Sequence, residues 1–365
     1  MTEHPYKSAP VRAFWSRAVA KDFESVAVPD LPAFSLTTDD GFMSAGSCFA
    51  SNVRRYLEAR GLRYTVTETP HPLWPEAVEA PYYEAFSARY GNIYTARQMA
   101  QLLERALGMF APAEEYWEAD GTYIDPFRPG LRHRARSVDE FRALTAQHLR
   151  AVLRAISQSS VFVFTLGLSE AWLSKDDGAV FPACPGTVSG TFDPARHAFH
   201  NFSAAEVTAD LVRMISLARS VNPALKIILT VSPVPLVATA SGRHVLVATT
   251  YSKSVLRVAA DEASRMLPQV VYFPAYELVT GPQAAGHAFE DDRRNVTEAA
   301  VATVMEAFFA TFFSSTPASG ATPVPAQPAA EAPAEGRLPA SVEAALSEAM
   351  AAAIREQCEE EMMDA

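Results

Sequence analysis

Five short apolar runs, separated by amphipathic segments, constrain the fold of this chain more than any other feature. Runs of this kind are typical of strands buried on both faces of a sheet. They cover residues 42–45, 62–66, 161–166, 227–231 and 270–273. Helical patterns cover residues 49–60, 96–107, 138–155, 204–220, 252–266 and 296–313. This alternation predicts an α/β fold, with a five-stranded parallel sheet and helices on both of its faces.

The composition divides the chain into four parts. Residues 1–35 are rich in Pro, Ser and charge, and we expect an N-terminal arm that wraps the α/β domain of residues 36–313. Residues 314–340 are mostly Pro, Ala, Ser, Thr and Gly, which predicts a disordered linker. Residues 341–365 favour a helix, either solvated on its tether or docked on a protein partner.

Charge and cysteine content exclude several function classes. The net charge of −11 disfavours nucleic acid or a membrane surface as a partner. The three cysteines have neither disulfide nor zinc spacing, so we expect no metal site and a cytoplasmic location. No signal peptide and no apolar run of membrane-spanning length is visible.

The loops after the strands should carry the chemistry, because sites form at the carboxyl ends of parallel strands. After the first strand, Gly46 permits a sharp turn, and Ser47 then lies at a helix N-terminus that favours a developing oxyanion. Alternatively, Ser47 only caps that helix. Cys48 is either an activated thiol or a packed apolar side chain, and only one of the two neighbours can face the cleft. The sequence has no glycine-rich phosphate-binding loop, which disfavours a nucleotide-binding domain.

Six segments, taken in order, resemble one known family. They are AGSCFA at 45–50, GNIYT at 91–95, TLGLSEAW at 165–172, TVSPVP at 230–235, YSKSVLR at 251–257 and YFPAYE at 272–277. Over residues 36–312 the chain resembles the GSCFA family of the SGNH/GDSL esterase–lipase superfamily. The resemblance implies a flavodoxin-like three-layer sandwich and a serine-dependent ester hydrolase that needs no cofactor.

The resemblance also implies roles for individual residues. Ser47 would be the nucleophile, and its backbone N–H would help to form the oxyanion hole. Gly91 would supply a second donor. The superfamily's Gly-x-Asn element corresponds to Gly167-Leu168-Ser169, so Ser169 replaces the asparagine, and Asn92 would compensate for its shorter reach.

The chain departs from the superfamily in the last block, where Asp-x-x-His is expected. Asp292 fits the acid, but Asn295 stands at the histidine position, and an amide cannot accept the serine proton. We expect Asn295 to cap the last helix instead, with Glu298 three residues later.

The base must therefore come from another loop. We expect it to be His244, after the fourth strand, with His287 as the alternative, although each fits an exposed loop histidine equally well. Glu170 would either orient a histidine or begin the next helix.

Two function classes follow from this pattern. The first is an ester hydrolase or acyl transferase acting on O-acyl groups, with a small-molecule or glycan ester as its substrate. The second is a catalytically degenerate binding or scaffold protein that keeps the cleft without the base.

Overall fold

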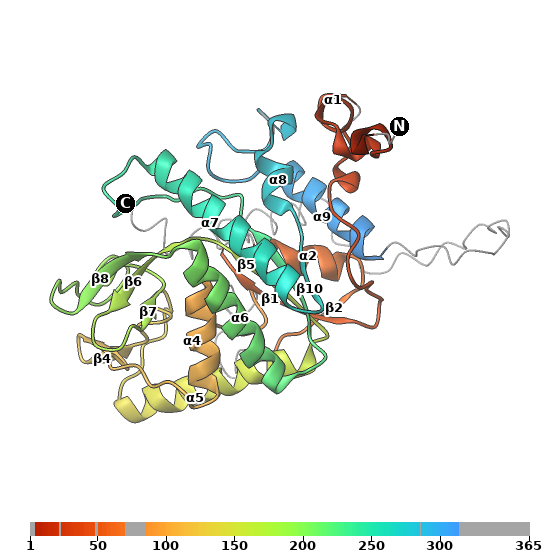
Figure 1. The fold of residues 1–365 in the computed structure, drawn as a ribbon. Helices are drawn as coiled ribbons and strands as arrows, with labels where there is room; N and C mark the ends of the chain where they lie inside the picture. The colour runs from red at the N-terminus through yellow and green to blue at the C-terminus, as the bar shows by residue number, and fades with distance from the viewer. Residues whose placement is uncertain (1–3, 22, 48–49, 70–84, 285, 314–365) are drawn as a thin grey trace, which may run out of the picture.

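A five-stranded parallel sheet forms the centre of the molecule. The computed structural model describes residues 4–313 except 22, 48–49, 70–84 and 285. The strand order is β2-β1-β5-β9-β10 (Figure 1), which is the flavodoxin-like order for strands taken in sequence. The strands are β1 (Gly41–Gly46), β2 (Arg63–Tyr64), β5 (Val161–Leu166), β9 (Lys226–Val231) and β10 (Val270–Tyr272). The predicted fold class is confirmed, and each of the five apolar runs overlaps one of these strands.

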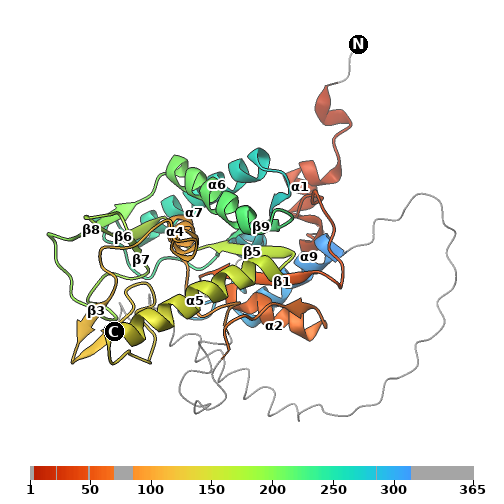
Figure 2. The ribbon, with the colours of Figure 1, turned by 90° about the horizontal axis from the view of Figure 1, so that it is seen from below.

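Helices cover both faces of the sheet, as Figure 2 shows. Side chains of β5 alternate between the two cores, with Phe162 and Phe164 in one and Val161 and Val163 in the other. The first core is covered by α4 (Ala96–Ala106), α5 (Val138–Gln158), α6 (Ala204–Val221) and α7 (Val245–Met266). The second is covered by α2 (Ser51–Ala59), α8 (Ala275–Thr280) and α9 (Glu298–Phe313). The sheet is therefore buried on both sides, which explains its continuous apolar runs.

Polar side chains fix where several helices begin. Thr95, Ser137 and Ser203 each accept a hydrogen bond from a backbone N–H in the first turn of α4, α5 and α6. At α9 this role belongs to Thr297, whose Oγ1 accepts from the N–H of Ala300 at 3.3 Å. The predicted cap at Asn295 is wrong, because α9 begins three residues after it, at Glu298.

A small β subdomain was not predicted. It consists of the hairpin of β3 (Trp117–Ala119) with β4 (Thr122–Ile124), and of the antiparallel sheet of β6 (Glu170–Ser174), β7 (Val180–Phe181) and β8 (His197–Asn201). Both lie to one side of the main sheet in Figure 1. Glu170 therefore begins a strand, and its predicted alternative place at the start of a helix is wrong.

The N-terminal segment wraps the domain only in part. Its first elements, η1 (Pro5–Lys7), η2 (Val11–Ala13) and α1 (Trp15–Ala18), project from the body in Figures 1 and 2. The later η3 (Ser25–Ala27) contacts α9, and the N–H of Leu36 donates to the carbonyl of Phe312 at 2.8 Å. The remaining short element is η5 (Pro282–Ala284).

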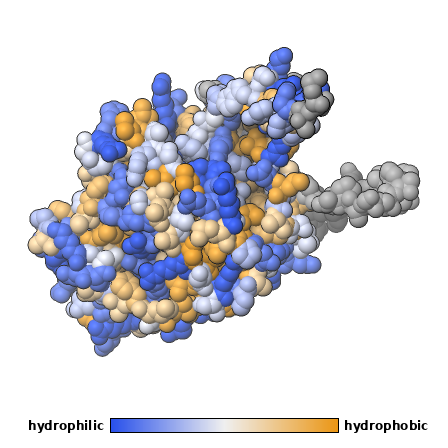
Figure 3. Space-filling model, in the orientation of Figure 1, coloured by the Kyte–Doolittle hydropathy of each residue, from blue (hydrophilic) through white to orange (hydrophobic). Residues whose placement is uncertain are grey.

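The predicted linker and C-terminal helix lie outside the described residues. Within the described part, no helix combines the length and the apolar character needed to cross a bilayer. On the face drawn in Figure 3, hydrophilic side chains are interspersed with small groups of hydrophobic ones.

Candidate active site

Gly46 shapes the turn that presents Ser47. Its φ of +148° is unfavourable for a residue with a side chain, and a Cβ there would lie 2.4 Å from the backbone oxygen of Thr165 on the neighbouring strand. β1 thus ends in close contact with β5, and the next residue, Ser47, lies at the carboxyl edge of the sheet.

The hydroxyl of Ser47 is buried and unpartnered. Ser47 is 6% exposed, and its Oγ makes no hydrogen bond to any of the described residues. It does not cap α2, whose N-cap position is Ala50 and has no side-chain hydrogen bond. Buried polar groups in folded proteins are nearly always hydrogen-bonded, so the Ser47 hydroxyl is one of a small set of exceptions in this structure.

Ser47 lines a small pocket of about 220 Å³ that is partly open to solvent. Three strand ends contribute to it: Ser47 follows β1, Gly167 and Leu168 follow β5, and Ser232 and Val234 follow β9. Tyr94 and Lys253 complete the lining. The structure therefore brings residues of separate loops together at the edge of the sheet that the sequence indicated.

The segment of residues 91–95 is fixed beside this pocket by backbone hydrogen bonds. The N–H of Ile93 donates to the carbonyl of Gly46 at 2.8 Å, and the N–H groups of Gly167 and Leu168 both donate to the carbonyl of Tyr94 at 3.0 Å. Tyr94 lines the pocket, whereas Gly91 and Asn92 belong to the same segment without lining it.

Gly167 contributes space to the pocket. A Cβ at this position would lie 3.1 Å from the Cβ of Ser47 and 3.3 Å from the carbonyl oxygen of Tyr94. Its N–H is already bonded to that carbonyl. Gly167 therefore keeps the region in front of Ser47 open, and its N–H is not free to bind an oxyanion.

Ser169 does not face Ser47 as a donor. Its hydroxyl donates to Oδ1 of Asn201 at 2.7 Å, and its backbone N–H donates to Oγ of Ser252 at 2.8 Å. A hydroxyl has one proton to donate. The predicted oxyanion role of Ser169 would require the bond to Asn201 to break.

Lys253 is a charged pocket residue that was not among the predicted site residues. It lies on α7, is 1% exposed, and its Nζ donates to the carbonyl of Gly167 at 2.7 Å. Its helical spacing from the buried Leu256 and Ala260 places it on the apolar face of α7. A lysine on the apolar face of a predicted helix is unusual, and this pattern could have identified Lys253 from the sequence.

The two predicted bases lie elsewhere. His244 is the exposed N-cap of α7, and its Nδ1 accepts from the N–H of Leu246 at 3.2 Å. It precedes Lys253 by nine residues, about 14 Å along a helix axis. His287 is exposed after η5. Neither residue lines the Ser47 pocket.

Asp292 is paired with Asn295 at the surface. The carboxylate accepts from the N–H groups of Arg294 and Asn295 at 2.8 and 2.9 Å, and from Nδ2 of Asn295 at 2.6 Å. Partial burial acts to raise the pKa of Asp292, but these hydrogen bonds outweigh it and hold the pKa below the usual value. Asp292 thus orients the amide that replaces the expected histidine, and neither residue lines the Ser47 pocket.

Glu170 lies just beyond the loop after β5. Its Oε1 accepts from Oγ1 of Thr239 at 2.8 Å, and burial raises the pKa of its carboxyl. No histidine is bonded to it in the described part of the chain. Cys48 lies outside the described residues.

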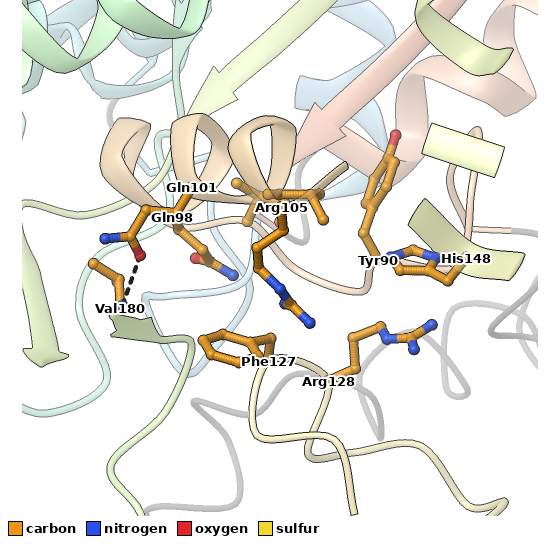
Figure 4. Close-up of a pocket in the computed structure, with 10 residues that line it drawn as sticks. Tyr90, Gln98, Gln101, Arg105, Phe127, Arg128, His148 and Val180 are labelled. Carbon is orange, nitrogen blue, oxygen red and sulfur yellow. Dashed lines mark hydrogen bonds between the residues drawn. The ribbon is translucent and has the colours of Figure 1, made fainter. Parts of the chain in front are cut away.

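A second cavity, shown in Figure 4, does not contain Ser47. Its wall includes the guanidinium groups of Arg105 and Arg128 and the imidazole of His148. His148 Nδ1 lies 2.7 Å from Oε2 of Glu68, and burial lowers the pKa of this imidazole. Among the described residues, no cluster of His, Cys, Asp and Glu has the arrangement of a metal site.

Comparison with known proteins places the chain in a family. The model of the GSCFA family matches residues 41–308. The chain is similar to the crystal structure of a family 3 carbohydrate esterase from Talaromyces cellulolyticus, with 10% identity, a TM-score of 0.37, and coverage of 74% of this chain and 94% of that one. It is also similar to a family 3 carbohydrate esterase from Clostridium thermocellum, with 9% identity, a TM-score of 0.33 and coverage of 74% and 93%. No curated protein sequence matches the chain. Since the family model covers most of its length, the chain belongs to the GSCFA family.

Proposed function

We propose that the protein is a serine-dependent ester hydrolase or acyl transferase that acts on O-acyl groups of a small molecule or glycan. One observation carries this proposal: the unpartnered hydroxyl of Ser47, which lies in a pocket at the carboxyl edge of the sheet. The family resemblance favours the same role for this serine. No cofactor is required for this chemistry.

The pocket suits a small acyl group. It is partly open to solvent, and its described lining consists of only seven residues. Gly167 leaves open the region beside the Ser47 side chain where an ester carbonyl would approach. We assign the oxyanion to the backbone N–H of Ser47, with Gly91 and Asn92 as further donors once substrate is bound.

The assay is hydrolysis of p-nitrophenyl esters of increasing acyl length by the full chain. We expect acetate to be preferred, and Ser47→Ala to abolish turnover and labelling by a fluorophosphonate probe. Ser216→Ala is the matched control, because this exposed serine donates to the carbonyl of Val212 on α6, outside the pocket. Activity that survives in Ser47→Ala would refute the proposal.

A binding or scaffold role is the second candidate. It is favoured by the absence of a histidine from the described lining of the Ser47 pocket, together with Asn295 at the superfamily's histidine position. A wild-type protein that is folded, hydrolyses none of these esters and leaves the fluorophosphonate unreacted would support this second role.

A further inference from the structure

We propose that the side-chain amine of Lys253 is the general base that activates Ser47. This inference rests on the proposed ester hydrolysis and supplies the proton acceptor that Asn295 cannot provide. Its central observation is that Lys253 and Ser47 line the same small pocket although 206 positions separate them in the sequence.

The Lys253 amine is held in place by the loop after β5. Its Nζ donates to the carbonyl of Gly167 at 2.7 Å, while Oγ of the preceding Ser252 accepts from the N–H of Ser169 at 2.8 Å. Ser252 and Lys253 of α7 therefore both bind the loop after β5, and Gly167 of this loop packs beside the Ser47 side chain. In the described structure no hydrogen bond joins Lys253 to Oγ of Ser47, and catalytic hydrogen bonds that are poorly formed in a free enzyme commonly tighten when substrate binds.

The environment of Lys253 favours an amine that can accept a proton. The residue is 1% exposed, and α7 packs it toward the apolar core. Removing a lysine from water disfavours its charged form, which is how buried lysines come to act as bases. A neutral lysine amine carries one lone pair that can accept a proton, and it can still donate an N–H to a carbonyl such as that of Gly167.

The other ionisable groups near the pocket are less suited than Lys253 to accept the Ser47 proton. Tyr94 is the other titratable residue in the pocket lining, and a tyrosine phenol with its ordinary pKa near 10 is a poor proton acceptor at neutral pH. Glu170 is bonded to Thr239. Further along α7, Asp261 pairs with Arg257 and Arg265, and Glu262 accepts from Thr208 of α6.

The reaction is balanced with Lys253 as the only proton carrier. As Oγ of Ser47 bonds to the ester carbonyl carbon, the amine takes the hydroxyl proton. When the tetrahedral intermediate collapses, the bond to the alcohol oxygen breaks, and the ammonium returns the proton to that oxygen. Water then attacks the acyl-serine, Lys253 takes its proton, and that proton passes to Oγ of Ser47 as the carboxylic acid leaves.

The first test compares Lys253→Met and Lys253→Arg with the wild-type protein in the p-nitrophenyl acetate assay. We expect both variants to lose about 10²- to 10⁴-fold in kcat, the usual contribution of general-base catalysis. Arginine keeps a positive charge and donors but cannot accept a proton at assay pH. Lys175→Met is the matched control, because Lys175 also donates from Nζ to a backbone carbonyl, that of Pro194, outside the pocket.

The second test separates a base from a structural lysine. In Lys253→Ala, added methylamine or ethylamine should restore turnover, and the acidic limb of the pH–rate profile should move to the pKa of the added amine. A folded Lys253→Met or Lys253→Arg variant within tenfold of wild-type kcat would overturn the inference, with ester hydrolysis by Ser47 intact. A wild-type protein without esterase activity would instead overturn the proposed function.

Discussion

Replacing Gly46 by alanine tests how the fold presents Ser47. The added methyl group would lie 2.4 Å from the backbone oxygen of Thr165 and 2.8 Å from its Cβ, and the φ of +148° would have to be held by a residue with a side chain. Backbone atoms of a central strand cannot move aside as a flexible side chain can. β1 and β5 must therefore move apart at Gly46, next to Ser47.

The magnitude follows from two costs. Overpacking a well-packed site costs about 1–3 kcal/mol, and a strained backbone conformation costs about 1–3 kcal/mol. We therefore expect Gly46→Ala to lower the free energy of unfolding by about 4 kcal/mol. For a domain of this size that corresponds to a decrease in Tm of roughly 10 °C.

Gly61→Ala is the matched control for Gly46→Ala. Gly61 also has a positive φ, +71°, but a Cβ there would meet no atom within 4 Å, so only the conformational cost of about 1–2 kcal/mol remains. Thermal unfolding followed by circular dichroism measures both variants, and esterase activity is assayed well below the lower Tm. Equal decreases in Tm, or full activity in Gly46→Ala, would refute the proposed close contact between β1 and β5.

Three further predictions concern side chains outside the pocket. Because burial lowers the pKa of His148, the unfolded chain binds a proton below about pH 6.5 that the folded chain does not, so the free energy of unfolding falls as the pH drops. His148→Gln should flatten this dependence by up to about 1.4 kcal/mol per pH unit in urea titrations, and an unchanged slope would contradict this reasoning. Thr297→Ala should destabilise the protein by about 1 kcal/mol and more than Asn295→Ala does, since Thr297 provides the cap of α9. His244→Ala should keep kcat within about threefold of wild type, because this histidine is an exposed helix cap, and a loss of 100-fold or more would restore it as the base.

The main sheet was predictable because its strands are buried on both faces. A strand such as β5 needs apolar residues on both of its faces, so the run VFVFTL, with Thr165 as its one polar residue, predicted both its position and its parallel environment. The turn at Gly46 and the edge position of Ser47 followed from the same pattern. These features depend on residues that are close together in the sequence.

Features that depend on distant contacts could not be predicted in this way. β7 has two residues and β3 has three, and they form because Trp117 packs on Phe181 across the β subdomain. The first turns of α7 were missed because they expose Leu246 and Val247, which breaks the apolar periodicity. The position of Lys253 at the Ser47 pocket arises only when α7 packs against the loop after β5.

The central claim is that Oγ of Ser47 is the nucleophile, and the most direct test is to locate the covalent adduct. The full chain would be treated with a fluorophosphonate, digested, and analysed by tandem mass spectrometry across the peptide that contains Ser47 and Cys48. We predict a single phosphonylated residue, Ser47, and no adduct in Ser47→Ala. An adduct on another residue of an active protein would contradict the account.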